Sequence, residues 1–386
     1  MVEDAYHFFI TICAASVSGG MEVIMNYLEN YLNYYTGENR KQIFKIFFDF
    51  INCLRTNDYD TMKTLLSDDC IADISMTGHF EGAGQVCEGL SWPGPKMDVQ
   101  RITFSSFVCR THDCEARQCA YTQHLYALED EKNVFPFTFG GEFNNSYRKI
   151  NGQWKISHIR YDLMYEDGNN SYVKDKWKLM DYGVFYGHTP MINEELDAPW
   201  FAIPIDDEPQ SDAEQIFEVE FKNNIGQDGN VFHLSQSIYT DDIALDFSNH
   251  KNVNKNYSVK SDSNYYGRKA AANFFKAKSH KEARLQHIAS MVELKINGNT
   301  ARAYMMRSEY HRIKNNIYNK KTIHEHPVVA LHQIDFVKEE NQWKMKRMSY
   351  YPIMEFLPIG DDCICFDDYI CGDQFWQPIK KQLHLN

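Results

Sequence analysis

The side chain in this sequence best suited to chemistry is a histidine, His287, in the stretch LQHIASMVELKINGNTARAYM over residues 285–305. The ordinary pKa of imidazole lies close to neutral pH, so a histidine that faces a cavity can take up and release a proton there. A histidine at the start of an apolar strand pattern can equally be a packed residue bonded to a neighbouring carbonyl. Both interpretations stay open until the elements around His287 are known.

The composition fits a globular protein of about two domains. The chain has 386 residues, which exceeds one ordinary core and suits two domains with connections. Its 25 Phe and 24 Tyr supply ample side-chain volume for two cores. Acidic residues exceed basic ones by 53 to 40, giving a formal net charge of -13. Such a field repels phosphate backbones, so we expect no nucleic-acid partner.

Cysteine spacing and hydropathy favour a reduced, cytoplasmic protein. The ten cysteines have no regular spacing, and no uninterrupted apolar run reaches the roughly 18 residues that span a bilayer. The apolar run near the N-terminus follows acidic residues, whereas a signal peptide carries Lys or Arg there. Cys109, His112, Cys114 and Cys119 have a spacing that fits no standard zinc site. We therefore predict no membrane partner and no metal.

A repeat runs through the chain. The segment QIFKIFFDFINCLRTNDYDTMKTLLSDDCIADIS, from Gln42, matches QIFEVEFKNNIGQDGNVFHLSQSIYTDDIALDFS, from Gln215, over 34 positions without a gap. Apolar residues at helical spacing, followed by an alternating stretch, predict a helix, a second short helix and a strand in each copy.

Further segments also occur twice, in the same order. HFEGAGQVCEGL and YYGRKAAANFF each give an aromatic residue, a Gly turn and a short helix. Long antiparallel hairpins are predicted from Arg101 and from His287, turning at HDC and NGN. Each copy then closes on a strand that contains a Trp, in NGQWKIS and ENQWKMK. The chain therefore holds two α+β units in tandem.

The repeat sets the expected domain boundaries. MEVIMNYLENYLNYY has apolar residues at helical spacing, and DAPWFAIPIDDEPQS ends in the acid, Pro and Ser cluster typical of a linker. The prediction is a helical N-terminal extension over 1–38, a first domain over 39–168, a linker over 169–210, a second domain over 211–357 and a C-terminal tail over 358–386.

This order of elements resembles the SnoaL-like, nuclear transport factor two-like superfamily, which includes polyketide cyclases, scytalone dehydratase, bile-acid dehydratases, ketosteroid isomerase and many binding proteins. The resemblance implies an α+β fold of two tandem cone-shaped barrel domains, each with helices closing a strongly bent antiparallel sheet. It is most specific where the SnoaL-like group often reads H-x3-N-x2-I-x-V-x-G-x-x-A, matched here by His287, Leu294, Ile296, Gly298 and Ala301. Met291 takes the place of the Asn.

The resemblance also implies a catalytic pair in the second copy. The group often carries a catalytic Asp near the end of its first helix, and the ungapped match puts this position at Asp228, or at Arg55 in the first copy. The first copy has Arg101 in place of His287. A carboxylate bonded to an imidazole fixes its tautomer and raises the basicity of its other nitrogen. Asp228 in GQDGN is otherwise a typical turn residue.

Other side chains receive roles from the same resemblance. Tyr310 or His311, on the returning strand, is expected to donate to a developing enolate oxygen, and His124 takes the position of Tyr310 in the first copy. Met291 and His124 are expected to contact a ligand.

The two arginines of the first copy have two interpretations. Arg55 and Arg101 hold a carboxylate or pair with Asp73 if they share the first cone, and otherwise lie at the surface.

The resemblance implies a lyase or isomerase that needs no cofactor and acts on a small hydrophobic ligand with a carbonyl group. Asp228 and His287 would be its general acid and base. The alternative is a non-catalytic ligand-binding or scaffolding protein built on the same two cones. Members of the superfamily commonly pair through the outer face of the sheet, so we expect the two copies to form an internal pseudo-dimer, with further self-association left open.

Overall fold

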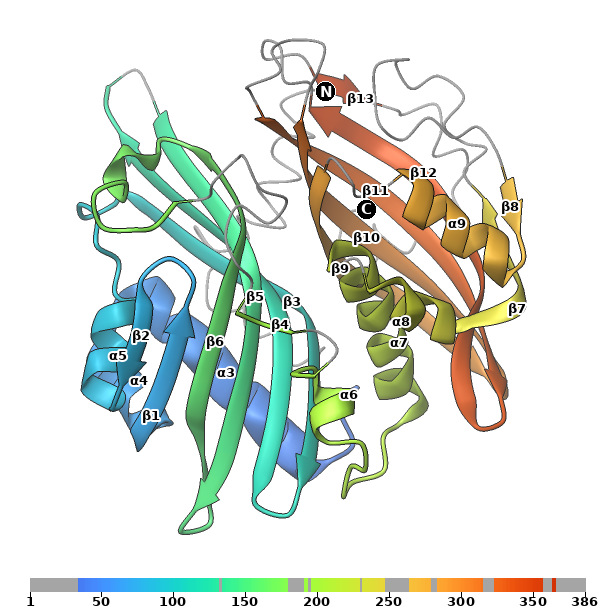
Figure 1. Cartoon of the computed structure of the whole chain (residues 1–386), viewed down its shortest axis with the longest axis horizontal. Coiled ribbons are helices and arrows are strands. Elements are labelled where there is room, and N and C mark those ends of the chain that lie inside the picture. The colour runs from blue at the N-terminus through green and yellow to red at the C-terminus, as the bar shows by residue number, and fades with distance from the viewer. Residues whose placement is uncertain are drawn as a thin grey trace, which may run out of the picture. The chain divides into compact units, whose positions relative to one another are not determined.

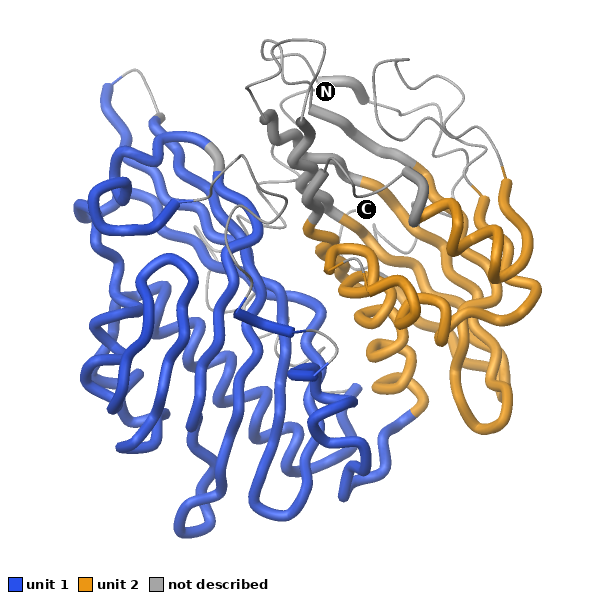
Figure 2. The backbone as a smooth tube through the Cα atoms, in the orientation of Figure 1, with its two compact units in different colours: residues 1–211 blue, residues 212–386 orange. Residues whose placement is uncertain are grey.

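The computed structural model describes residues 34–131, 134–179, 191–193, 196–229, 231–246, 264–278, 283–314, 323–356 and 363–365. The chain divides into two compact units, residues 1–211 (unit 1) and residues 212–386 (unit 2) (Figure 2). Most of the predicted N-terminal extension and C-terminal tail lies outside the described residues. The predicted pairing of the two copies stays a prediction.

Each unit has the helices and strands of one copy of the repeat. In unit 1 they are α3 (Glu38–Thr56), α4 (Tyr59–Leu65), β1 (Leu66–Ile74), β2 (Gly78–Glu81), α5 (Ala83–Leu90), β3 (Val99–His112), β4 (Glu115–Glu129), β5 (Val134–Ile150) and β6 (Gln153–Gly168), followed by α6 (Pro199–Ala202). In unit 2 they are α7 (Asp212–Asp228), α8 (Phe232–Ser237), β7 (Tyr239–Asp246), β8 (Asn264–Tyr266), α9 (Arg268–Lys278), β9 (Ala283–Asn297), β10 (Thr300–Lys314), β11 (Ile323–Glu339), β12 (Gln342–Phe356) and β13 (Cys363–Cys365).

The two sheets have the same topology. Their strand orders are β2-β1-β6-β5-β4-β3 and β8-β7-β12-β11-β10-β9, with β13 added to β12. Neighbouring strands are antiparallel except for β1 with β6 and β7 with β12. The first helix packs on the sheet in each unit, α3 against β3 and α7 against β9 (Figure 1). The predicted α+β fold is confirmed, and the strand order of one sheet recurs in the other.

A glycine opens the short third helix of each unit. Gly82 has a φ of 84° and Gly267 a φ of 86°, a left-handed conformation that glycine adopts without steric cost. Their N–H groups donate to the carbonyls of Cys70 at 2.8 Å and Ile243 at 2.7 Å. The predicted Gly turns are therefore the same backbone feature in both copies.

The described part of the predicted linker packs within unit 1. The Arg40 side chain in α3 is fully buried. Its guanidinium pairs with Asp206 at 3.0 Å and donates to the carbonyls of Glu208 at 2.7 Å and Pro209 at 3.0 Å.

Of the helices in the described ranges, none is long and apolar enough to cross a membrane.

Candidate active site in unit 2

The first helix of unit 2 carries polar side chains on a face that is apolar in unit 1. The aligned residues are Phe47 and Glu220, Phe50 and Asn223, Ile51 and Asn224, and Leu54 and Gln227, all of them buried. Burying a polar group is unfavourable unless it is hydrogen-bonded, so a polar face at these positions requires partners inside the unit.

Strand register supplies the remaining correspondences between the units. The hairpins β3–β4 and β9–β10 each turn on two residues, and the first of these, Asp113 or Gly298, has a positive φ of 51° or 58°. Counted from these turns, Phe104 corresponds to Ala289 and Thr122 to Arg307.

The sheet opposite this helix is also more polar in unit 2 than in unit 1. By the register of the last two strands, Phe143 of unit 1 corresponds to His332 of unit 2. Each contacts the tyrosine paired with it across the sheet, with ring centroids 4.5 Å apart for Phe143 and Tyr161 and 4.9 Å apart for His332 and Tyr350. A phenylalanine cluster in unit 1 is thus replaced by polar residues in unit 2.

Asp228 and His287 form a buried pair within this polar region. Asp228 is the last residue of α7, and His287 lies in β9; their exposed fractions are 1% and 4%. One carboxylate oxygen of Asp228 accepts a hydrogen bond from the backbone N–H of His287 at 2.9 Å, and the other is bonded to His287 Nδ1. The same carboxylate therefore fixes both the strand and the imidazole ring.

A separate group of hydrogen bonds lies along α7, beginning one residue before Asp228. Tyr239 Oη donates to Asn223 Oδ1 at 2.6 Å, and Gln227 Nε2 donates to the same oxygen at 2.9 Å. Arg307 Nη2 in β10 in turn donates to Gln227 Oε1 at 3.5 Å. Burial raises the pKa of Tyr239 well above its ordinary value, so its hydroxyl keeps its proton.

Glu220 lies one turn before Asn223 and is the acid of this face. In the described part of the chain neither of its carboxylate oxygens makes a hydrogen bond of ordinary geometry, and the side chain of Asn224 lies near enough to lower its pKa. Burial raises the pKa of Glu220 to about 7, and the positive charge of Arg307 opposes that rise. Near neutral pH this carboxyl group can therefore gain or lose a proton.

Comparison with known proteins identifies unit 2. The SnoaL-like domain model matches residues 211–349. Residues 211–349 form a SnoaL-like domain. No characterised protein compared with the whole sequence matches it.

Solved structures similar to the chain include a provisionally named scytalone dehydratase of Novosphingobium aromaticivorans DSM 12444, with 16% identity and a TM-score of 0.30 over 33% of this chain and 86% of that one. Another is hexachlorocyclohexane dehydrochlorinase LinA-type3 of Novosphingobium barchaimii LL02, with 12% identity and a TM-score of 0.30 over 34% and 91%. These likenesses concern the fold alone.

The predicted correspondence between His287 and Arg101 is wrong by one residue. In the SnoaL-like domain His287 pairs with Glu309, and the equivalent pair in unit 1 is Ile102 with His124. His124 therefore corresponds to Glu309 and not, as predicted, to Tyr310. The sequence match extended without a gap only through the first strand, and a slip of one residue in a strand exchanges its two faces.

The other residues predicted for the SnoaL-like domain have different outcomes. Met291 is buried in the hydrophobic core of the domain. Tyr310 pairs with Gln286 and His311 with Leu285, but the side chains of Tyr310 and His311 lie outside the described residues. Their roles stay predictions.

The arginines of unit 1 are not brought together with Asp73. The Asp73 carboxylate is bonded to His79 and His158, at 2.7 Å in each case. Arg55 Nη2 donates to Asn52 within its own helix at 3.4 Å, and the lining of the aromatic cavity of unit 1 includes neither Arg55 nor Arg101. The predicted pairing with Asp73 is therefore wrong.

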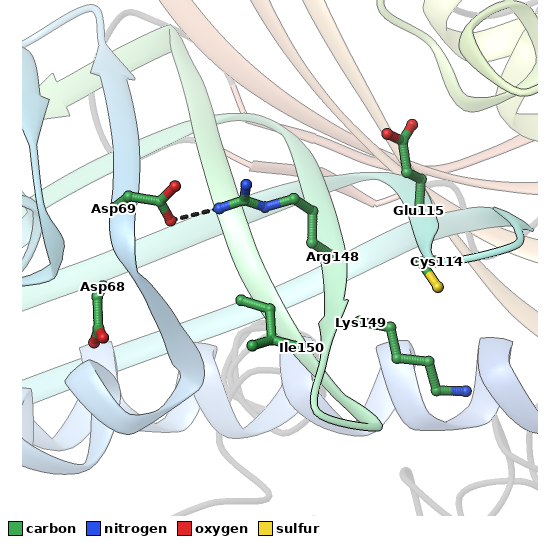
Figure 3. Close-up of a pocket in the computed structure, with 7 residues that line it drawn as sticks. All are labelled: Asp68, Asp69, Cys114, Glu115, Arg148, Lys149 and Ile150. Atoms are coloured by element: carbon green, nitrogen blue, oxygen red, sulfur yellow. Dashed lines mark hydrogen bonds and ion pairs between the residues drawn. The ribbon is translucent and has the colours of Figure 1, made fainter.

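An open groove of about 450 Å³ in unit 1 is a weaker candidate than the SnoaL-like domain. Figure 3 shows Arg148 reaching toward Asp69, with which it forms an ion pair, while Cys114 and Glu115 come from a hairpin end. An ion pair this exposed to water contributes little energy. The groove offers no buried polar group, and we assign it no role.

The polar face of α7 was not predicted from the sequence, although the signal was present. The ungapped match already places Glu220 over Phe47 and Asn223 over Phe50. A helix whose buried positions change from apolar to polar between two copies of one fold points to a site in the polar copy.

Proposed function

We propose that unit 2 is a lyase or isomerase of the dehydratase type that needs no cofactor, with Asp228 and His287 as its general acid–base pair. The observation that supports this most strongly is the buried carboxylate of Asp228, which accepts from both the backbone N–H and the ring Nδ1 of His287. A packing histidine needs only one such partner.

The pair is suited to removing a proton from carbon. A carboxylate only accepts hydrogen bonds, so Asp228 keeps the imidazole proton on Nδ1 and makes Nε2 the ring nitrogen that can act as a base. In the proposed reaction His287 Nε2 takes the proton from the carbon next to a carbonyl group, and the electron pair of the broken C–H bond forms an enolate.

The proton then returns to the products. In a dehydration the enolate re-forms the carbonyl and expels the β-hydroxyl group, which takes the proton from the His287 imidazolium and leaves as water. In an isomerisation the same proton is delivered to another carbon. The pair ends in its starting protonation state, so neither path requires an oxidant or a metal to balance. A positioned base of this kind contributes a factor on the order of 10² to 10⁴.

Arg307 is the proposed partner of the enolate oxygen. It is a buried cation on the strand next to His287, two residues from Glu309, the cross-strand neighbour of His287. A fixed positive charge in a desolvated site stabilises charge that develops in the transition state. Tyr310 and His311 remain candidates for the same task.

The buried polar groups of α7 favour a substrate that carries polar groups besides its carbonyl. Glu220 and Asn223 present buried polar atoms, and the Nδ2 of Asn223, like both oxygens of Glu220, has no hydrogen-bond partner in the described ranges. Hydroxyl groups on the substrate would satisfy them. We therefore propose a hydroxylated carbonyl compound in preference to a wholly apolar one.

The test is exchange of the proton next to the carbonyl. The full-length protein is incubated in D₂O with 4-hydroxybutan-2-one and larger β-hydroxy ketones, and NMR follows loss of that proton and appearance of the enone. We expect His287→Gln to lower the rate by roughly 10²- to 10⁴-fold. The control His79→Gln, an exposed histidine of unit 1, keeps the parent rate.

Equal rates for the parent and His287→Gln would remove His287 from the mechanism. If the parent binds these ketones, as native mass spectrometry can detect, yet exchanges no proton faster than buffer, the alternative of a non-catalytic binding or scaffolding protein holds.

A further inference from the structure

Unit 1 has a cavity of its own, outside the site of unit 2. Its volume is about 40 Å³, and its walls are largely aromatic. Three of the wall rings, on β4 and β5, are nearly parallel and stacked: the ring planes of His124 and Phe139 differ by 14° with centroids 4.2 Å apart, and those of Tyr126 and Phe139 differ by 10°. Trp177 stands edge-on to Phe139, at 5.1 Å and 86°.

His124 brings an unused acceptor to this cavity. The Thr122 hydroxyl lies 3.5 Å from two acceptors, the carbonyl of Gly141 and Tyr161 Oη; when it donates to either, its oxygen accepts from His124 Nε2 at 3.1 Å. This assigns the imidazole proton to Nε2 and leaves Nδ1 as an acceptor. His124 is 6% exposed, and its Nδ1 has no hydrogen-bond partner in the described part of the chain. Buried acceptors are usually paired with a hydrogen-bond donor, so a ligand that supplies a donor would suit Nδ1.

The cavity disfavours charge. None of its lining residues is an Asp, Glu, Lys or Arg. Burial lowers the pKa of His124 to about 3, so its ring is neutral at physiological pH. A charged ligand would lose its hydration with no opposite charge in the lining to replace it. The occupant is therefore an uncharged molecule.

Size and stacking indicate a ring. A water needs roughly 10–15 Å³, and a cavity that binds benzene has roughly 150 Å³, so a ring fits here only if one wall moves. Trp92 is the wall that would have to move: it is half-buried, lies between α5 and β3, and would give up the hydrogen bond from its indole Nε1 to the carbonyl of Pro95 at 2.8 Å. Its ring lies parallel to Tyr126, with centroids 4.1 Å apart. A ligand ring can take that stacking position.

We propose that unit 1 binds a small uncharged aromatic molecule with one O–H or N–H group, of the phenol or indole class, which donates to His124 Nδ1 and replaces Trp92 on the Tyr126 ring. This site is independent of the reaction proposed for unit 2.

The experiment measures binding of phenol, benzene and tetramethylammonium to the full-length protein by calorimetry and by NMR of the tryptophan indole N–H groups. Trp92→Phe assigns the Trp92 signal. We expect phenol to shift that signal saturably and to bind roughly 2- to 10-fold more tightly than benzene, because only phenol supplies a donor. His124→Phe keeps a flat ring and should abolish this preference, whereas the control His79→Phe should keep it.

Three results would each overturn the proposal: equal affinities of phenol and benzene for the parent, binding of tetramethylammonium without phenol, or no response of Trp92 to phenol. The comparison of ligands on the parent decides the matter even if His124→Phe does not fold. Parallel titrations of His287→Gln should match the parent, so failure here and failure of the proposed reaction are separate results.

Discussion

Helices α3 and α7 occupy the same place in two copies of one fold and bury opposite chemistry. In α3 the Phe47 ring lies 5.1 Å from Phe104 and 5.9 Å from Phe143, centroid to centroid. In α7 the residue aligned with Phe47 is Glu220, and Asn223 and Gln227 of the same helix form hydrogen bonds with Tyr239 and Arg307. The same fold can therefore have either an apolar or a polar interior. The interior of unit 1 is filled by packed apolar side chains. The interior of unit 2 contains, at the same positions, buried polar groups that can act on a ligand.

The largest expected effect on stability comes from giving α3 of unit 1 the acidic residue that α7 of unit 2 has at the aligned position. Phe47→Glu removes a fully buried ring and places a carboxylate among phenylalanines. Losing the ring alone costs about 3–5 kcal/mol, and burying the charge adds to this. We expect hydrogen exchange of the α3 and β3 amides to become fast while β12 amides stay protected. Unchanged exchange in α3, as expected for the exposed control Lys45→Glu, would contradict the comparison.

The reverse exchange, in unit 2, has the next largest effect. His287→Ile introduces the residue of unit 1 and leaves the Asp228 carboxylate buried without its imidazole. Leaving a buried carboxylate without its hydrogen-bonded partner costs about 3–5 kcal/mol, whereas replacing both partners with apolar residues is often neutral. The double variant Asp228→Leu/His287→Ile should therefore recover most of the loss in the free energy of unfolding, measured by exchange of unit 2 amides. A double variant as unstable as the single one would mean that the pair is not coupled in this way.

A smaller effect distinguishes α7 from α3: the stability of unit 2 depends on pH because α7 carries a buried acid. The pKa of Glu220 is raised from 4.5 to about 7 in the folded protein, so the folded state holds this proton more tightly than the unfolded state. The resulting stabilisation is complete below pH 4.5 and is lost as the pH rises through 7, a change of about 3 kcal/mol in unit 2. Urea unfolding followed by exchange of α7 amides should detect it.

Two variants test whether Glu220 is the source of that pH dependence. Glu220→Gln should flatten the dependence between pH 5 and 8, whereas Glu218→Gln, on the same helix and paired with Lys222 at 2.5 Å, should leave it in place. A slope that survives Glu220→Gln would assign it to another group.

The architecture could be predicted from the sequence because it depends on features that repeat. Apolar spacing, the Gly turns and the tryptophan strands occur in both copies, and each is a local signal. The Asp228 and His287 pair could be placed only through the family resemblance, because the two residues are far apart in the chain and no local pattern links them.

What could not be predicted depends on register and on side-chain surroundings. The segments between the first strand and the long hairpin differ between the copies, so the ungapped match does not extend across them, and Ile102 rather than the predicted Arg101 corresponds to His287. The two-residue turns at Asp113 and Gly298 are the local features that carry the correct register. The isolation of His124 Nδ1 depends on how Thr122 bonds to another strand, which a sequence does not record.

The smallest expected effect tests the part of the comparison in which the two units agree. The Trp154 indole donates to Asn39 at 3.0 Å, and the Trp343 indole donates to Asp212 at 2.9 Å, each joining the last strand to the start of the first helix. Asn39→Ala and Asp212→Ala should each cost about 0.5–1.5 kcal/mol. Only the second cost should depend on pH. The pKa of Asp212 is lowered by its bond from Lys338, so its contribution is present above pH 3.8 and is lost as the pH falls through the folded pKa. Denaturation at pH 7 and at pH 3 measures both costs. If the two variants lose stability equally at both pH values, the charge on Asp212 adds nothing to the hydrogen bond that Asn39 makes without one.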